Sequence, residues 1–219
     1  MATLEIVIGN KNYSSWSLRG WLMVKATGAP FRERRILLDV PDTAARIRQV
    51  SPAGRVPILI ADGLKVHDTL AIGEYLNECF PAAGLWPAAP EARAVARAVS
   101  AEMHAGFEAL RQAMPMNCRA RKPGLDARPE ALADIARITE IWTDCRARFG
   151  AGGPFLFGAF GIADCMYAPV ASRFATYDVA LSALAAAYRD AVLAHPAMAD
   201  WLAGAAAEPE VIAAEEITE

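Results

Sequence analysis

Residues 54–72 read GRVPILIADGLKVHDTLAI, a pattern that predicts two short strands, a tight turn between them and the start of a helix. The Asp-Gly pair at its centre is a strong signal for a hairpin turn. Pro57 opens the first strand, and Asp68 and Thr69 stand where the second strand gives way to the helix. The stretch therefore predicts a ββα unit with an acid and a hydroxyl at the start of its helix.

Upstream of this unit, strand and helix patterns alternate. The expected strands are residues 4–8 and 31–38, and the expected helices are 18–28, 42–50 and 69–80. Residues 1–80 therefore predict the order βαβαββα. The first two strands should be parallel, because a crossover helix joins them, and the last two should form the antiparallel hairpin.

Downstream of the unit the character of the chain changes. Residues 81–90, PAAGLWPAAP, have no periodicity and predict a linker between two domains. The segments after it are rich in alanine, which favours helix. The expected helices are 91–119, 130–149, 162–177, 182–194 and 197–206. The fold class is therefore an α+β domain over 1–80, followed by an all-α helical bundle over 91–219.

Composition excludes several classes of function. The chain has 219 residues, a formal net charge of -3 and a pI of about 5.7, so nothing in its charge predicts nucleic-acid binding. No stretch has the ~20 uncharged apolar residues of a membrane helix, and the N-terminus does not resemble a signal peptide. Four widely spaced cysteines fit a reducing compartment. We expect a soluble, cytoplasmic protein that does not act on membranes.

Metal binding is not predicted either. The cysteines form no CxxC pair, and the three histidines share no spacing typical of a metal ligand set. We interpret His67, His104 and His195 as structural or surface residues.

Val56 and Pro57 allow two interpretations. Proline has no N–H to donate, so Pro57 fits the first position of an edge strand. Alternatively, a cis bond would turn the N–H and C=O groups of Val56 outward, where they could pair with the backbone of a peptide-like ligand.

Asp68 and Thr69 also allow two interpretations. Both are good N-cap residues, which would make them purely structural. The same helix start presents free N–H groups and a partial positive charge, so it could bind a carboxylate while Asp68 holds an ammonium group. A ligand with both groups would satisfy the pair.

A third polar group lies between the first strand and first helix. Residues 12–17 read NYSSWS, and their serines could cap the helix. They could instead donate a hydrogen bond to a thiolate held at the helix start, which would lower the pKa of the thiol. The loop holds no cysteine, so thioredoxin-type redox chemistry is not supported.

The chain resembles cytosolic glutathione transferases over essentially its whole length. The stretches IGNKNYSSWSLRGWL (8–22) and GRVPILIADGLKVHDTLAIGEYL (54–76) are similar to bacterial serine-type members, with some likeness to the zeta and theta classes. The resemblance implies a thioredoxin-like first domain, glutathione as co-substrate, no metal, and a homodimer. It implies a detoxifying enzyme that activates the glutathione thiol for attack on a small hydrophobic electrophile. The alternatives are an isomerase of the maleylacetoacetate type and a non-catalytic glutathione-transferase-like binding protein.

The resemblance also implies the site. Its catalytic residue falls on Ser14 or Ser15, and an alternative alignment shifts it toward Asn12. Val56 and a cis Pro57 would pair with the cysteinyl part of glutathione, and Asp68 and Thr69 would hold its γ-glutamyl end. The other expected glutathione-binding residues are Asn12, Ser17 and Arg55, the last near the glycyl carboxylate.

The second domain offers weaker signals. An apolar stripe at helical spacing could line a substrate pocket or belong to the core; its candidates are Phe107, Leu110, Met114 and Asn117. The basic residues Arg119, Arg121, Lys122 and Arg128 fit a solvated loop or an anionic substrate. The resemblance also implies a capping box at residues 161–164, in which Asp164 is present but Gly161 replaces the usual Ser or Thr.

Overall fold

The computed structural model describes residues 3–124 and 128–217. The N-terminal part consists of β1 (Leu4–Ile8), α1 (Ser15–Ala26), β2 (Phe31–Arg35), α2 (Thr43–Val50), β3 (Ile58–Ala61), β4 (Leu64–His67) and α3 (Thr69–Cys79). The C-terminal part consists of α4 (Pro90–Ala105), α5 (Glu108–Ala113), α6 (Pro129–Phe149), α7 (Ile162–Thr176), α8 (Ala183–Ala194) and α9 (Pro196–Ala207). Short 3₁₀ turns lie at Pro81–Ala83, Gly150–Gly152 and Ala213–Glu215. A βαβαββα domain followed by an all-helical one confirms the predicted fold class.

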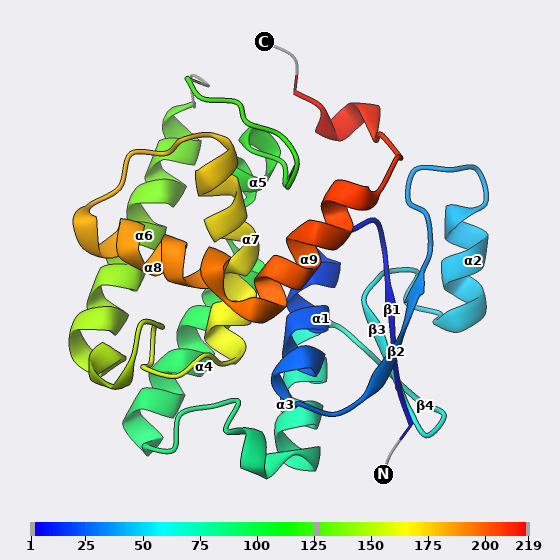
Figure 1. Cartoon of the computed structure of the whole chain (residues 1–219), viewed down its shortest axis with the longest axis horizontal. Helices are drawn as coiled ribbons and strands as arrows, with labels where there is room; N and C mark the ends of the chain where they lie inside the picture. The colour runs from blue at the N-terminus through cyan, green and yellow to red at the C-terminus, as the bar shows by residue number, and fades with distance from the viewer. Residues whose placement is uncertain (1–2, 125–127, 218–219) are drawn as a thin grey trace.

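The four strands form one sheet in the order β2-β1-β3-β4. Strand β1 runs parallel to β2 and antiparallel to β3, and β3 and β4 form the predicted antiparallel hairpin. Helices α1 and α3 cover one face of the sheet, and α2 covers the other (Figure 1). Side chains of β1 alternate between these faces: Leu4, Ile6 and Ile8 join the large core, and Val7 joins the smaller core under α2.

Helix α7 forms the centre of the helical domain. It is buried along almost its whole length and contacts α1 of the first domain as well as α4 and α8. Trp142 of α6 packs against Tyr167, Phe174 and Tyr188, with ring centroids 4.8 to 6.1 Å apart. The sheet and its helices therefore lie against a rigid, aromatic-rich bundle.

Gly161 explains the unusual capping box at the start of α7. A Cβ atom there would lie 2.6 Å from the carbonyl oxygen of Leu85, too close for any other residue. Asp164 still completes its half of the box, because its Oδ2 accepts from the Gly161 N–H at 2.9 Å. Its Oδ1 accepts from the Leu156 N–H and the Tyr188 hydroxyl. Burial raises the pKa of Asp164 to about 6.

The prediction of one continuous helix over 91–119 is wrong. Helix α4 ends at Ala105, Gly106 is extended, and Phe107 has a left-handed φ of 61° that carries its ring into the core. The chain then makes the short α5 and leaves helical structure, where Pro115 and Pro123 lack the N–H that a helix needs. Burial of one aromatic ring thus overrides the local preference for helix.

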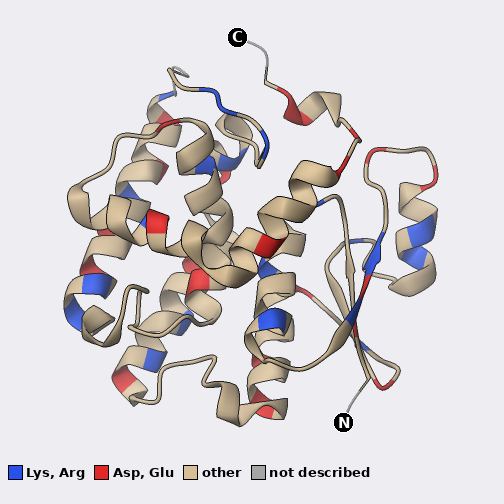
Figure 2. Cartoon of the chain, in the orientation of Figure 1, with Lys and Arg blue, Asp and Glu red and all other residues tan. Residues whose placement is uncertain are grey.

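Two other predicted bounds differ from the structure by three residues, and several more by one or two. Helix α1 begins at Ser15 rather than at residue 18, because Ser14 caps it, and β2 ends at Arg35 rather than at residue 38. Figure 2 shows acidic and basic residues interspersed along the chain in both domains. None of the described helices is long and apolar enough to cross a membrane.

Candidate functional site

A cleft of about 680 Å³ lies where the carboxyl end of β1, the loop before β3 and the start of α3 meet the helical domain. Its wall combines residues from both domains: Ser14, Trp16, Leu38, Ile47, Ala53, Gly54, Arg55, Val56, Pro57, His67, Asp68, Thr69 and His104. Nine residues are predicted for catalysis and glutathione binding. Six of them line the cleft, namely Ser14, Arg55, Val56, Pro57, Asp68 and Thr69, whereas Ser15 does not.

Ser14 is the N-cap of α1 and is 8% exposed. Its hydroxyl donates to Ser17 Oγ at 2.7 Å and accepts from the Ser17 N–H at 3.4 Å. Ser17 Oγ also accepts from the Gly9 N–H at 2.9 Å. The Ser14 hydroxyl is therefore fixed at the helix start, where the partial positive charge of α1 favours an anion.

Asp68 and Thr69 occupy the start of α3, and one of them carries an unused hydroxyl. Asp68 Oδ1 caps the helix by accepting from the Leu70 N–H at 2.9 Å, while Oδ2 lies 3.1 Å from Nε2 of His104. Thr69 Oγ1 is buried and has no hydrogen-bond partner. A buried polar group without a partner is costly, so a ligand that pairs with this hydroxyl is favoured.

Val56 and Pro57 also line the cleft, and the bond that joins them is cis. Pro57 is buried, Val56 is half-buried and Arg55 is exposed at the rim. The cleft wall thus combines an exposed cation, a backbone segment, and an acid–hydroxyl pair at a helix start.

Three predicted glutathione-site residues lie outside the cleft lining. Ser15 begins α1 without lining the cleft, and Ser17 lies fully buried beneath Ser14. Asn12 is also fully buried: its amide donates to Asn117 Oδ1 at 2.9 Å, and its carbonyl oxygen Oδ1 accepts from the Arg119 N–H at 2.9 Å.

The four predicted substrate-pocket residues do not line the cleft either. Phe107, Leu110 and Met114 belong to the large core, and each is 8% exposed or less. Asn117 is 1% exposed and is held by Asn12 and by Glu216. The structure places this stripe in the interior, which matches the alternative interpretation as core.

Seven residues of the cleft were not assigned to the site from the sequence, among them Trp16 and His104. His104 was interpreted as structural, yet it reaches from α4 to Asp68, and its Nδ1 is buried without a partner. Its ring meets Trp16 edge-on, with centroids 5.1 Å apart. No spacing in the sequence links residues 16, 68 and 104, because only the packing of the two domains brings them together.

The backbone just before Ser14 is held by residues 208–217, which we name the C-terminal strap. The Glu208 carboxylate accepts from the N–H groups of Lys11 and Asn12 at 2.8 and 3.1 Å. Glu208 also lies 2.8 Å from Arg35 Nη1, and it is 7% exposed. The strap thereby fixes the loop that presents the candidate catalytic serine.

Replacing Glu208 with alanine is expected to lower the free energy of unfolding by about 2 kcal/mol, because one buried and one part-buried N–H group lose their acceptor. Denaturant unfolding measures this change. Glu210→Ala is the matched control, since Glu210 pairs with the same Arg35 at the surface and should change stability by less than ~1 kcal/mol. Equal effects of the two variants would contradict the role of Glu208.

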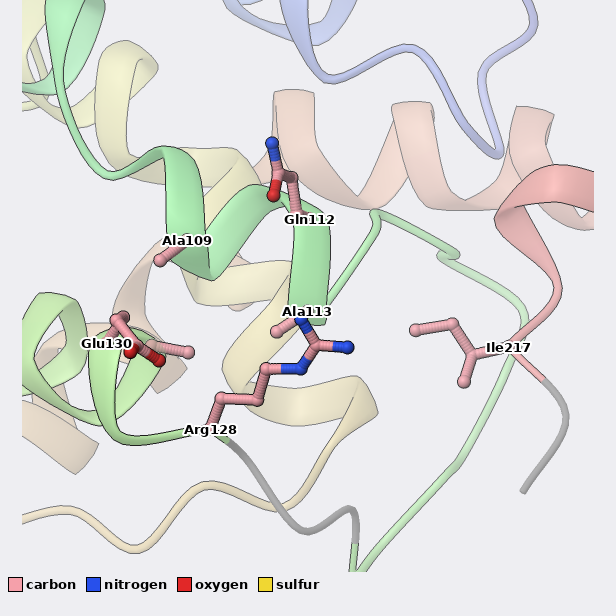
Figure 3. A pocket seen from close by; sticks show the side chains of 7 residues that line it. Ala109, Gln112, Ala113, Arg128, Glu130 and Ile217 are labelled. Carbon is pink, nitrogen blue, oxygen red and sulfur yellow. The ribbon is translucent and has the colours of Figure 1, made fainter.

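A second cavity, of about 620 Å³, lies between α5, the start of α6 and the strap (Figure 3). Its wall is formed by Ala109, Gln112, Ala113, Arg128, Glu130, Ala131 and Ile217. Arg128 is the one lining residue that the sequence suggested for a ligand, as part of a basic group for an anionic substrate. Among residues 3–124 and 128–217, no group of three or more His, Cys, Asp or Glu side chains is placed to hold a metal ion.

Comparisons with known proteins agree with this geometry. Residues 13–79 match the glutathione S-transferase N-terminal domain, and residues 92–204 match the C-terminal domain. A glutathione transferase homologue from Burkholderia, solved with bound glutathione, superposes with a TM-score of 0.71 at 22% identity, over 93% of this chain and 98% of that one. A tau-class glutathione S-transferase from mango gives 0.71 at 16% identity, over 93% and 96% of the two chains.

A curated relative from Caenorhabditis elegans, described as a probable maleylacetoacetate isomerase, is 32% identical over 96 residues. This match spans 44% of each chain, so it leaves more than half of the relative unmatched. The two domain matches cover most of the sequence and include the serine loop, the Val56–Pro57 segment and the start of α3. On these grounds the chain belongs to the glutathione S-transferase family.

Proposed function

We propose that the protein is a glutathione transferase, which activates the glutathione thiol for attack on a small electrophile. The observation that carries this proposal is the buried, unpaired hydroxyl of Thr69, which lies in one cleft with Ser14 and Val56. Glutathione has a carboxylate and an ammonium group at its γ-glutamyl end, a peptide backbone and a thiol. The cleft offers a partner for each of these groups.

The proposed arrangement follows from the cleft wall. The γ-glutamyl carboxylate accepts from the Thr69 hydroxyl at the positive end of α3, and the ammonium pairs with Asp68 Oδ2. The cysteinyl backbone lies along Val56, and the thiol points to Ser14. The Ser14 O–H turns from Ser17 Oγ to the sulfur as the thiol proton leaves to solvent, and its donation and the dipole of α1 stabilise the thiolate. The thiolate then forms a sulfur–carbon bond with the electrophile as the leaving group departs.

Replacing Thr69 with valine is expected to weaken glutathione binding by about 10-fold, since a hydrogen bond to a charged group is lost. Valine has the shape of threonine, and the deleted hydroxyl has no partner in the protein, so stability should stay the same or rise. Isothermal titration with glutathione and denaturant unfolding measure the two effects. A destabilised variant with unchanged affinity would show that the hydroxyl is structural.

Cysteinylglycine, which lacks the γ-glutamyl group, provides the matched ligand. Thr69→Val should bind this dipeptide as wild type does. If wild type binds glutathione no better than cysteinylglycine, the proposed arrangement is wrong. If it binds glutathione without lowering the pKa of the thiol, the protein is a non-catalytic binding protein.

A second candidate function is a glutathione-dependent isomerisation of the maleylacetoacetate type. It is favoured by the match to the probable maleylacetoacetate isomerase of C. elegans. Assaying conjugation and cis–trans isomerisation side by side separates the two activities. From the family resemblance we also propose a cytoplasmic homodimer with a role in detoxification, which sedimentation and fractionation would test.

A further inference from the structure

Three arginines that are far apart in the sequence converge between the two domains. Arg19 lies on α1, Arg111 on α5 and Arg173 on α7; Arg19 and Arg173 are 1% and 4% exposed. Burial lowers the pKa of all three guanidinium groups. The positive charge of Arg111 adds to this effect for both Arg19 and Arg173. We name these three side chains the arginine cluster.

No carboxylate of the described residues forms an ion pair with the arginine cluster. Nε of Arg19 donates to the carbonyl of Met166 at 3.1 Å, and Nε of Arg173 donates to that of Met114 at 2.7 Å. Nη1 of Arg19 and Nε of Arg111 are buried without any partner. The carboxylates of Asp68, Glu108, Asp134 and Glu215 act on the cluster only from a distance. Buried charge without a direct ion pair is costly, so the cluster would be stabilised by an anion.

Trp16 connects the arginine cluster to the cleft. The guanidinium carbon of Arg19 lies 4.3 Å from the centre of the Trp16 ring, and that of Arg111 lies 5.2 Å from it. Trp16 and His104 line the cleft, and Arg111 donates to the carbonyls of Met103 and His104. Arg19 and Arg111 do not themselves line the cleft, but both guanidinium groups contact the Trp16 ring that does, so an anion beside Trp16 would lie within one side chain of the cluster.

We propose that the Trp16 end of the cleft binds an anionic group, such as a carboxylate, on the second substrate. Arg111, which is half-buried, supplies the contact, and Arg19 adds positive charge from behind Trp16. This inference rests on the proposed function, because the electrophile must lie next to the thiolate. It replaces the expectation of a small hydrophobic electrophile with that of a small electrophile that carries a negative charge.

The basic residues that the sequence suggested for an anion do not line the cleft. Arg119 donates to the Glu210 carbonyl and to the Tyr13 hydroxyl, at 2.8 and 3.0 Å. Lys122 donates to the Ile217 carbonyl of the strap. Arg121 is exposed on the loop, and Arg128 lines the second cavity. Among the described arginines, the buried cluster is therefore the better candidate for an anionic substrate.

Two electrophiles that differ only in charge test the inference: a chloronitrobenzoate and its methyl ester. In both, the glutathione thiolate forms a carbon–sulfur bond at the ring, and chloride leaves. Each kcat/KM is divided by the rate constant for uncatalysed reaction with glutathione. Wild type should prefer the carboxylate by about 10-fold, the range of a hydrogen bond to a charged group. Preference for the ester would overturn the proposal.

Arg111→Gln should lower kcat/KM for the carboxylate by about 10-fold and for the ester by less than about twofold. Arg111→Lys keeps the charge and should retain part of the preference, which guards against a folding defect in the first variant. Arg121→Gln removes one exposed positive charge and should leave kcat/KM unchanged for both substrates. If Arg111→Gln lowers kcat/KM equally for both substrates and raises the pKa of the bound thiol, the cluster stabilises the thiolate and the proposal is wrong.

A binding measurement separates this inference from the proposed function. Nitrobenzoate, which has no leaving group, is titrated into the glutathione-saturated protein by calorimetry. Binding that weakens about 10-fold in Arg111→Gln supports the anion site even if neither electrophile reacts. Absence of nitrobenzoate binding overturns the anion site. If nitrobenzoate does not bind but the protein turns over the ester, only the anion site is wrong and the proposed transferase function stands.

Discussion

Replacing Ser14 with alanine is expected to lower kcat for glutathione conjugation by about 10²-fold, the usual effect of removing one donor to a reacting anion. Ser14 lines the cleft at the N-cap of α1, and its hydroxyl is held in place by Ser17. Without it the thiolate keeps only the helix dipole, so the pKa of the bound thiol should rise. Initial rates and the ultraviolet absorbance of the thiolate across pH measure both effects.

Ser15→Ala provides the control for this prediction. Ser15 is adjacent in the sequence and carries the same hydroxyl group, but it does not line the cleft. Its replacement should change kcat by less than about twofold, because no donor to the reacting anion is removed. Equal loss in both variants, or none in either, would show that neither serine activates the thiol.

Replacing Asp164 with alanine is expected to lower the free energy of unfolding by about 4 kcal/mol, since three donors lose their acceptor in the interior. These are the N–H groups of Leu156 and Gly161 and the hydroxyl of Tyr188. Alanine also removes the first-turn carboxylate of α7, the helix at the centre of the molecule. Urea unfolding followed by circular dichroism measures the loss, and a change below ~1 kcal/mol would contradict it.

The pH dependence of stability checks the environment of Asp164. Burial raises its pKa to about 6 in the folded protein, above its ordinary value, so the ionised form is disfavoured by folding. The stability from the protonated form is present at low pH and lost as pH rises through 6. Between pH 5 and 7, the free energy of unfolding of wild type should fall by about 1 kcal/mol relative to that of Asp164→Asn, whose side chain does not titrate. If the difference in unfolding free energy between wild type and Asp164→Asn stays the same across this pH range, the pKa of Asp164 is not raised.

The fold was predictable because its signals are local. The hairpin turn, the β-branched strand and the alanine-rich helices each lie within a few residues, and together they fix the order of the elements. The failure at Phe107 shows the limit of such signals. Its neighbours favour helix, but burial of its ring is decided by residues of other helices, which no window of sequence contains.

The candidate site was predictable only in part, for the same reason. Ser14, Val56 and Asp68 follow strands or begin helices, so topology alone places them at one end of the sheet. Trp16 and His104 meet in the cleft through contact between the domains, and the role proposed for Arg111 depends on the same contact. Their roles depend on which face of α4 and α5 meets α1, and the apolar stripe around residues 103–116 gave no indication of this.

The hydrogen bonds between Glu208 and the first loop set the order in which the site can form during synthesis. Lys11 and Glu208 are 197 residues apart, so the loop leaves the ribosome long before its acceptor exists. The first domain can fold early, as N-terminal domains generally do. Its serine loop acquires its final support only when residue 208 has emerged, so a nascent chain would hold a folded sheet before it holds a finished catalytic loop.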